Sequence, residues 1–201
     1  MPSVAAAVAA GRSSPALCRQ EKTNEFNGVT RLRSGRTVVR RIRPEEIRPL
    51  LDTARGAIGG VLASELVVRR VAAHHPDALW TFVRNGRSVG CLAMLMLNET
   101  GLEALLSEII DFRDPAPGLL SNPTVPPAAI YVWGLMASPL AIDGVAKVIL
   151  RLNASGYHLA DVYAFQATEQ GAGLMRRLGF EPLPGFSRKL FRYVRLANRP
   201  H

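Results

Sequence analysis

The pair Asn85-Gly86 constrains the fold of this chain more than any other local feature. It lies between two runs rich in strand-forming residues, "ALWTFVR" and "RSVGCLAMLML". A two-residue turn between antiparallel strands needs positive φ at both central residues, and Asn-Gly adopts that conformation readily. The sequence therefore predicts a β-hairpin near the middle of the chain.

The segments that flank this hairpin have patterns of their own. "TVVRRI", from Thr37, is expected to be the first strand, and "PEEIRPLLDTAR" a helix with acidic residues in its first turn. A second apolar-periodic stretch spans about Val61 to Ala73, and a further amphipathic segment follows the hairpin at Leu102 to Asp111. A proline-rich loop comes next, with Pro115, Pro117, Pro123, Pro126 and Pro127.

Strand and helix patterns alternate after the proline-rich loop. In chain order they are the strand "AIYVWGLMA", a helix from Gly144 to Asn153 that ends at Gly156, the strand "DVYAFQA", a helix from Glu169 to Leu178 that ends at Gly179, and the strand "FSRKLFRYVRL". A hairpin followed by such alternation predicts an α/β fold, with a mixed sheet covered by helices on both faces.

Length and composition exclude several classes of protein. A chain of 201 residues with 48% hydrophobic content has enough apolar surface for one core. Its two cysteines, Cys18 and Cys91, form no CxxC motif, which argues against a disulfide framework or a zinc site. No apolar run approaches the roughly 18 to 20 residues of a membrane span. We expect a soluble, cytoplasmic protein with no metal and no membrane partner.

The net charge of +9 is concentrated near the N-terminus. Residues 1–43 hold nine of the 25 basic residues but two of the 16 acidic ones. We therefore divide the chain into a flexible basic arm, residues 1–36, and a folded domain, residues 37–201. Phe26 is the arm's one aromatic residue, so a nucleic-acid partner is unlikely and a solvated tail is favoured. The alanine-rich, acid-free first 20 residues leave a targeting peptide open.

The stretch "GLMASPLAIDGVAKVIL", residues 134–150, places a helix directly after a strand. A helix N-terminus carries unpaired N–H groups and a positive dipole end, and both attract phosphate. Gly144 and Ala146 are small enough for a ligand to approach the backbone. Such spacing is common by chance and taken alone favours close packing between a helix and a sheet, so both interpretations stay open at this point.

The segment "RRLGFEPL", Arg176 to Leu183, follows this strand–turn–helix unit, which itself follows the hairpin. This order of elements resembles that of the GNAT acetyltransferase superfamily. The resemblance covers about residues 37–196. It implies a GNAT-like, mostly antiparallel mixed sheet in which the fourth strand splays from the fifth and acyl-CoA lies between them. It also implies an acyl-CoA-dependent N-acyltransferase with acetyl-CoA as co-substrate and a small-molecule or peptide amine as acceptor.

The resemblance assigns binding roles to particular residues. The strand that bonds pantetheine would comprise Gly134, Leu135, Met136 and Ala137. The pyrophosphate turn would be Ala141 to Ala146, and the residues that bind the phosphates would be Gly144, Val145, Ala146 and Lys147. Thr168 falls near the family's usual asparagine. Ala141 replaces a polar turn residue, and Met175 replaces the tyrosine that often protonates the CoA thiolate. Asp143 would repel phosphate unless Lys147, four residues on, neutralises it.

Catalytic residues cannot be assigned from the sequence. The strand at residues 130–137 has no carboxylate, and Glu108, Asp111 and Asp114 upstream are more typical of a solvated helix face. His74, His75 and His158 lack metal-ligand spacing and are expected at the surface or in loops, and Cys91 is expected in the core. The alternative function is a catalytically degenerate GNAT-fold binding or regulatory module. A homodimer stays open for either function.

Overall fold

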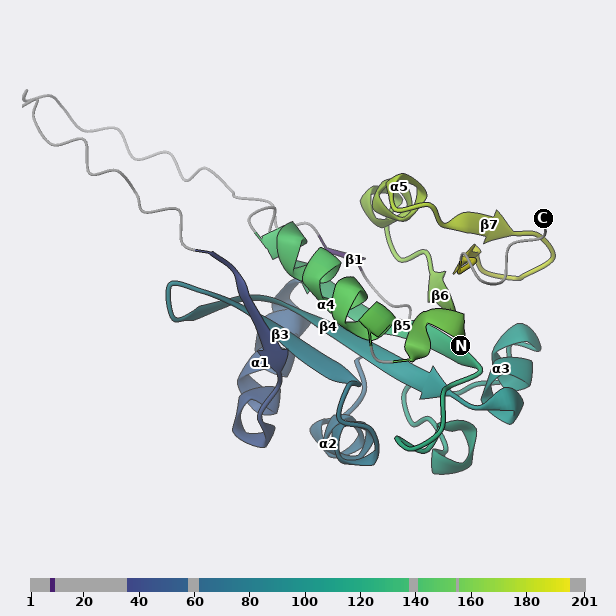
Figure 1. Ribbon diagram of the computed structural model, residues 1–201, viewed down its shortest axis with the longest axis horizontal. Coiled ribbons are helices and arrows are strands. Elements are labelled where there is room, and N and C mark those ends of the chain that lie inside the picture. Colours follow the sequence, from purple (N-terminus) through teal and green to yellow (C-terminus); the bar gives the residue numbers. More distant parts are fainter. Residues whose placement is uncertain (1–7, 10–35, 58–61, 138–140, 155, 196–201) are drawn as a thin grey trace, which may run out of the picture.

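The computed structural model describes residues 8–9, 36–57, 62–137, 141–154 and 156–195 (Figure 1). Its strands form one eight-stranded sheet in the order β2-β3-β4-β5-β6-β8-β7, and β1 pairs with β5 outside this path. The strands are β1 Val8–Ala9, β2 Val38–Arg41, β3 Leu79–Arg84, β4 Arg87–Leu97, β5 Ala129–Ala137, β6 Asp161–Phe165, β7 Glu181–Leu183 and β8 Leu190–Tyr193.

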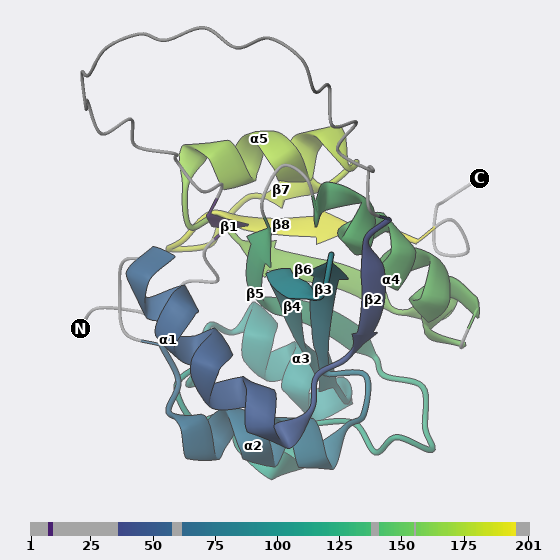
Figure 2. The ribbon, with the colours of Figure 1, turned by 90° about the vertical axis from the view of Figure 1, so that its left-hand side faces the viewer.

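Helices cover both faces of this sheet, which confirms the predicted α/β class (Figure 2). The α-helices are α1 Ile47–Ala57, α2 Glu65–His74, α3 Glu99–Leu106, α4 Ile142–Ala154 and α5 Glu169–Arg177, and the 3₁₀ turns are η1 Pro44–Glu46, η2 Pro117–Leu119 and η4 Tyr157–Leu159. The larger apolar core joins α1, α2 and α3 to one face of the sheet. A second core packs α4 on the opposite face, next to α5. Within the described ranges no helix is long and apolar enough to cross a membrane.

The strongest local predictions are confirmed. Asn85 and Gly86 have φ of 52° and 75° and join β3 to β4 as the expected hairpin. Strand β5 has the bounds that its apolar run predicts. Gly156 and Gly179 follow α4 and α5 with φ of 84° and 86°, the left-handed conformation in which a helix commonly ends.

Several predicted elements have different bounds in the structure, helix α3 and the final strand among them. Helix α3 begins three residues before the predicted Leu102, because Asn98 caps it by accepting a hydrogen bond from the Gly101 N–H at 2.8 Å. The predicted final strand, 186–196, is shortened to β8, and Glu181–Leu183 form β7, which pairs with it. Gly185, with φ of 88°, lies in the turn between these strands, and the apolar run alone did not reveal that turn.

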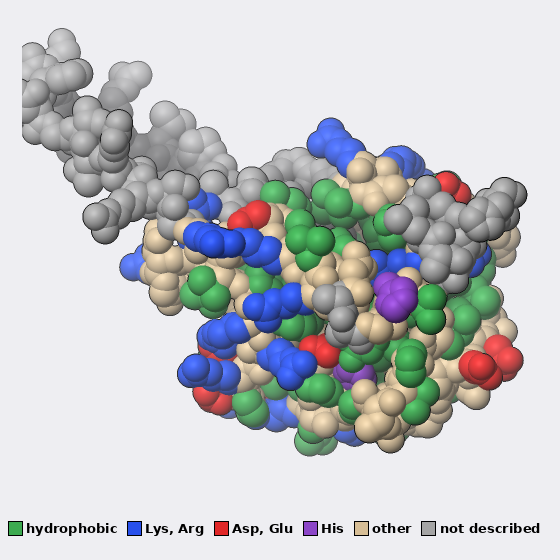
Figure 3. Space-filling view, viewed as in Figure 1, with side chains coloured by type: hydrophobic (Ala, Val, Ile, Leu, Met, Phe, Trp, Pro, Cys, Tyr) green, Lys and Arg blue, Asp and Glu red, His purple; other side chains and the backbone are tan. Residues whose placement is uncertain are grey.

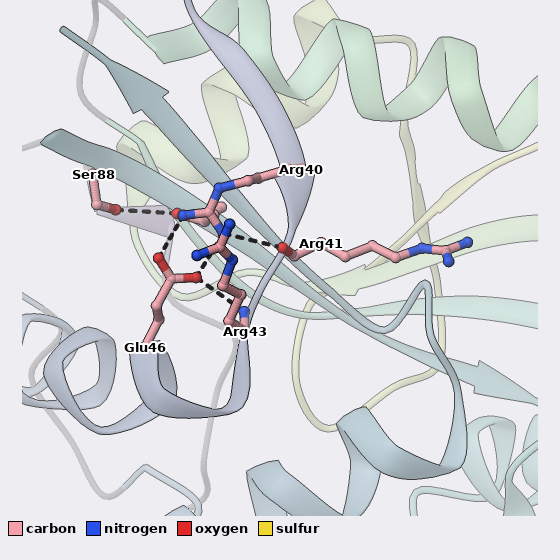
Figure 4. Close-up of polar contacts among 6 residues, drawn as sticks. Arg40, Arg41, Arg43, Glu46 and Ser88 are labelled. Atoms are coloured by element: carbon pink, nitrogen blue, oxygen red, sulfur yellow. Dashed lines mark hydrogen bonds and ion pairs between the residues drawn. The ribbon is translucent and has the colours of Figure 1, made fainter. Parts of the chain in front are cut away.

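Glu46 fixes the start of α1 against β2 (Figure 4). Its carboxylate accepts two hydrogen bonds from the Arg40 guanidinium and one from the Arg43 backbone N–H at 2.9 Å. The Thr81 and Ser88 hydroxyls lie 3.2 Å apart across the hairpin of β3 and β4. The hydrogen bonds from Arg40, followed by the backbone bond and the positive charges, lower the pKa of Glu46 to about 2 against the opposing effect of burial.

Glu46→Gln should therefore lower the free energy of unfolding at pH 7 by about 1 kcal/mol or less, because both side chains of the pair are 34% exposed and solvent screens them. The folded-state pKa lies below that of the unfolded chain, so this stability is present above about pH 4.5 and is lost as the pH falls toward 2. Urea unfolding at pH 7 and pH 3 measures the difference, with Glu45→Gln as control. An equal loss of unfolding free energy at both pH values would contradict the lowered pKa of Glu46.

Candidate functional site

Strands β5 and β6 separate within the sheet. They pair in parallel at three positions, from Ala129 with Asp161 to Tyr131 with Tyr163. Beyond these positions β5 continues along β4 to Ala137, while β6 continues along β8 to Phe165. The two strands are therefore paired at one end and separated by a gap at the other.

A β-bulge in β5 lies at the point where this gap begins. Ala93 of β4 faces Gly134, but the next residue, Met94, faces Val132, so Trp133 is an extra residue on β5. Such a bulge bends the strand and increases its twist, and bulges are common beside active sites. The Trp133 indole N–H donates to the Phe112 carbonyl at 2.9 Å, which holds the bulged residue on the face of α1 and α2.

The larger cavity at the gap has a volume of about 200 Å³ and lies on the face covered by α4 and α5. Val132 and Leu135 of β5 and Val162 and Ala164 of β6 form its floor. The walls are apolar side chains of the two helices, Met175 among them. The position that the resemblance assigns to a thiolate-protonating tyrosine is thus on the cavity wall, but a thioether occupies it.

Tyr193 of β8 also lines the larger cavity, and sequence reasoning missed it. Among the described residues that line this cavity, it has the one hydroxyl group. The centres of its ring and the Phe180 ring are 5.5 Å apart, and the guanidinium carbon of the buried Arg195 lies 5.6 Å from the centre of the Tyr193 ring.

A smaller cavity of about 80 Å³ lies on the opposite face, under α1 and α2. Its walls include Cys91 and Ala93 of β4, and Trp133, Gly134 and Met136 of β5. Leu135 borders both cavities, so the same stretch of β5 backbone has a cavity on each face. Of the four residues predicted to bond pantetheine, three line a cavity and Ala137 does not.

The N-terminal turn of α4, the predicted phosphate seat, is closely packed. Ala141 is fully buried, and a Cβ added to Gly144 would lie 2.8 Å from Cγ of Phe82. Gly144 thus has the packing role that the sequence left open, and Val145 lines the larger cavity while Ala146 is exposed. Residues 138–140, between β5 and α4 in the sequence, are outside the described residues.

Lys147 and Asp143 form the predicted pair, with 2.9 Å between Nζ and Oδ2. The same ammonium group donates to the Thr37 carbonyl at 2.6 Å. The hydrogen bond from Lys147, followed by one from Thr37, lowers the pKa of Asp143. Asp143 therefore carries a negative charge at neutral pH, half exposed, beside the positive end of α4.

The other predicted ligand, Thr168, caps α5 by accepting a hydrogen bond from the Gly171 N–H at 3.0 Å. Gln166 lies two residues earlier at the end of β6, and sequence reasoning missed it. Its Nε2 donates to Glu169 at 2.6 Å, while its buried Oε1 has no hydrogen-bond partner among the described residues. A buried acceptor without a partner is unusual and is often satisfied by a ligand or water.

The carboxylates considered from the sequence lie away from both cavities. Glu108 accepts from the Ser187 N–H at 3.0 Å, Asp111 accepts from the Arg113 N–H at 2.9 Å, and Asp114 pairs with Arg70. No Asp, Glu or His is among the described residues that line either cavity. The described part of the chain also holds no group of three or more His, Cys, Asp or Glu placed to bind a metal ion.

His158 is exposed and His75 lies in the loop after α2, as the sequence predicts for surface or loop histidines, but His75 is buried, with 2% of it exposed. His75 belongs to a buried network in which the Tyr157 hydroxyl donates to Asp77 at 3.1 Å and Arg41 pairs with the same carboxylate. Burial, followed by Asp77, raises the pKa of Tyr157 to about 12. Burial also raises the pKa of the Cys91 thiol to about 12, as expected for a core cysteine.

Lys and Arg side chains gather over β2 and the adjoining part of α4 (Figure 3). Arg40, Arg41 and Arg151 line a groove there together with Asp77 and Trp80. Arg40 and Arg41 are paired with Glu46 and Asp77, and Arg151 lies 5.6 Å from the centre of the Trp80 ring. These contacts explain the arginines as parts of the fold.

Two glycines near the gap should respond oppositely to alanine. Gly144→Ala should lower the free energy of unfolding by about 1 to 3 kcal/mol, because the added Cβ overlaps the Phe82 ring. Gly134→Ala should leave it unchanged or raise it by up to about 0.5 kcal/mol, because the nearest atom, Cβ of Ala93, is 3.9 Å away. Urea denaturation measures both, and Phe82→Leu should relieve the Gly144→Ala defect. Equal effects at the two glycines would contradict this packing.

No protein-family model matches the sequence, and no curated protein matches it. Solved structures share its fold. Ard1 from Thermoplasma volcanium is 7% identical with a TM-score of 0.55, covering 80% of this chain and 98% of its own. Chaetomium thermophilum Naa20, in complex with a bisubstrate analogue, is 11% identical with a TM-score of 0.52 over 79% and 86% of the two chains.

A GNAT-family acetyltransferase from Staphylococcus aureus Mu50 is 8% identical, with a TM-score of 0.51 over 78% of this chain and 98% of its own. At such low identities the likeness establishes the fold and nothing finer. The chain has the GNAT fold, which confirms the fold class that the sequence predicts.

Proposed function

We propose that the protein is an acyl-CoA-dependent N-acyltransferase whose donor lies between β5 and β6. The observation that carries this proposal is the separation of the two strands beyond Tyr131 and Tyr163, with a cavity beside the gap. A gap inside a sheet offers backbone N–H and C=O groups that a neighbouring strand would otherwise bind. The shared fold with a GNAT-family acetyltransferase supports the same class of reaction.

The chemistry of pantetheine matches this gap. Pantetheine is an extended chain with two amide groups, so it bonds a strand edge much as another strand does. In our proposal Leu135 and Met136 supply that edge, and the apolar walls of the larger cavity cover the hydrocarbon segments. Oε1 of Gln166, on the β6 side, would accept a hydrogen bond from a donor amide.

The phosphates of the donor would lie at the N-terminal end of α4, a helix of 13 residues whose dipole favours anions there. Lys147 adds a positive charge and Asp143 opposes it. Arg84, at the end of β3, acts electrostatically on Asp143 and shifts the local balance toward positive charge. We infer a phosphate seat that Asp143 weakens without abolishing.

The transfer step needs few groups from the protein. A neutral amine attacks the thioester carbonyl carbon, the C–N bond forms and the C–S bond breaks. The amine nitrogen gives up one proton to water, and the CoA thiolate takes up one proton. Met175 has no proton to give, so we assign the donor role to Tyr193. The smaller cavity, on the other side of β5, would receive the acceptor, and its apolar lining favours an amine attached to an apolar group.

A second candidate is a binding or regulatory module that keeps the fold without the reaction. The observation in its favour is that no carboxylate or imidazole is among the described residues lining either cavity. Removal of a proton from the amine would then depend on water. Binding of acyl-CoA without release of free CoA thiol in the presence of amines would favour this candidate.

Isothermal titration calorimetry with acetyl-CoA tests the proposal directly, and we expect binding below millimolar concentration. Asp143→Asn should tighten binding by about two- to fivefold at low salt, because it removes a negative charge beside the phosphates. The same variant should leave the affinity for S-acetyl-pantetheine, which has no phosphate, unchanged. Asp111→Asn serves as the matched control. No binding at millimolar acetyl-CoA, or equal effects on both ligands, would contradict the proposed seat.

Tyr193→Phe should lower kcat by about 100-fold or more, with a smaller change in KM, because it removes the proposed proton donor but keeps the ring. Tyr163→Phe, which alters a buried tyrosine in the other core, is the matched control. Met175→Tyr should raise turnover, and most clearly in the Tyr193→Phe background. The assay follows thiol release across a pH series. Unchanged turnover in Tyr193→Phe would exclude the assigned role.

A further inference from the structure

Strand β1 lies in the gap between β5 and β6. Val8 and Ala9 pair in parallel with Leu135 and Met136 of β5. Figure 1 draws β1 in purple near α5, and Figure 2 shows it below α5 beside the end of β5. Two residues of the predicted N-terminal arm thus occupy the edge of β5 that β6 has left.

The β1 pairing uses the same backbone that the proposed function assigns to pantetheine. Past the Trp133 bulge, β5 has two edges: β4 holds one, through Gly90 to Ala93, and β1 holds the other. Each N–H and C=O group on that second edge can bond an N-terminal strand or an extended ligand, but not both at once. An acyl-CoA molecule in the gap would therefore have to take the place of β1.

The sequence around β1 suits an apolar gap. Val8 and Ala9 carry no charge, and residues 4–10 of the sequence are all alanine or valine. A chain without charged side chains avoids the large penalty of burying an unpaired charge. Because β1 belongs to the same chain, it also competes at a high effective concentration, on the order of millimolar for a tethered segment.

We propose that β1 is a built-in competitor of the acyl donor: while Val8 and Ala9 pair with β5, the donor slot is closed, and acyl-CoA binds after they leave. This inference rests on the proposed function. Two paired residues form a weak strand that a ligand can displace. The apparent dissociation constant is then the intrinsic one divided by the fraction of molecules in which β1 has left the gap.

Three forms of the protein test this competition by calorimetry with acetyl-CoA. One is a chain without residues 1–12, and the second is full-length Val8→Pro/Ala9→Pro. The third, full-length Ser13→Pro/Ser14→Pro, is the control, with its prolines outside β1. Proline has no N–H to donate, so the pair at Val8 and Ala9 breaks the ladder without shortening the chain.

We expect the truncated chain and the Val8→Pro/Ala9→Pro variant to bind acetyl-CoA about tenfold more tightly than the control and the unaltered chain. A synthetic peptide of residues 1–12 should compete with acetyl-CoA for the truncated chain. In hydrogen exchange, acetyl-CoA should remove protection from residues 8–9 of the unaltered chain while Leu135 and Met136 stay protected.

Other outcomes overturn specific parts of the account. Equal affinities in all four proteins would overturn the competition and leave the proposed function standing. Weaker binding in both altered forms would also overturn it and make β1 a structural strand of the donor site. No binding in any form, with the fold intact by circular dichroism, would overturn the proposed function itself and the competition with it.

Discussion

Strand β5 lies inside the sheet, so its backbone groups need hydrogen-bond partners on both edges along its whole length. β4 supplies one edge from end to end. The other edge belongs to β6 as far as Tyr131, and to β1 at Leu135 and Met136. The bulge at Trp133 lies between these two segments. The two cavities, the proposed donor slot and the role of the N-terminal strand all depend on this change of partner.

The described groups around the gap are better suited to holding a ligand than to transferring protons. Both cavities are lined mostly by apolar side chains, and the carboxylate of Glu108, away from both, accepts a hydrogen bond from the Ser187 N–H. In the proposed reaction, rate acceleration would come from orientation and from excluding water, with Tyr193 as the proposed proton donor. This explains why the absence of a tyrosine at Met175 weakens the catalytic interpretation without removing it.

The sequence predicted the parts of the fold that local chemistry determines. Asn85-Gly86 and the glycine at 156 adopt positive φ wherever they occur in such turns, so the hairpin and the end of α4 could be placed in advance. Contacts between distant segments could not be placed from the sequence. No periodic signal in the sequence reveals that Tyr193 faces a cavity, that Gly144 packs against the Phe82 ring or that Val8–Ala9 pair with β5. Each of these contacts depends on tertiary packing.

The central claim is that the gap between β5 and β6 binds an acyl donor. A crystal structure of the protein grown with saturating acetyl-CoA tests it most directly. The account predicts electron density for pantetheine along Leu135 and Met136, with the phosphates at the N-terminal end of α4 and β1 displaced from the gap. Density for the cofactor at another surface, with β1 still paired to β5, would contradict it.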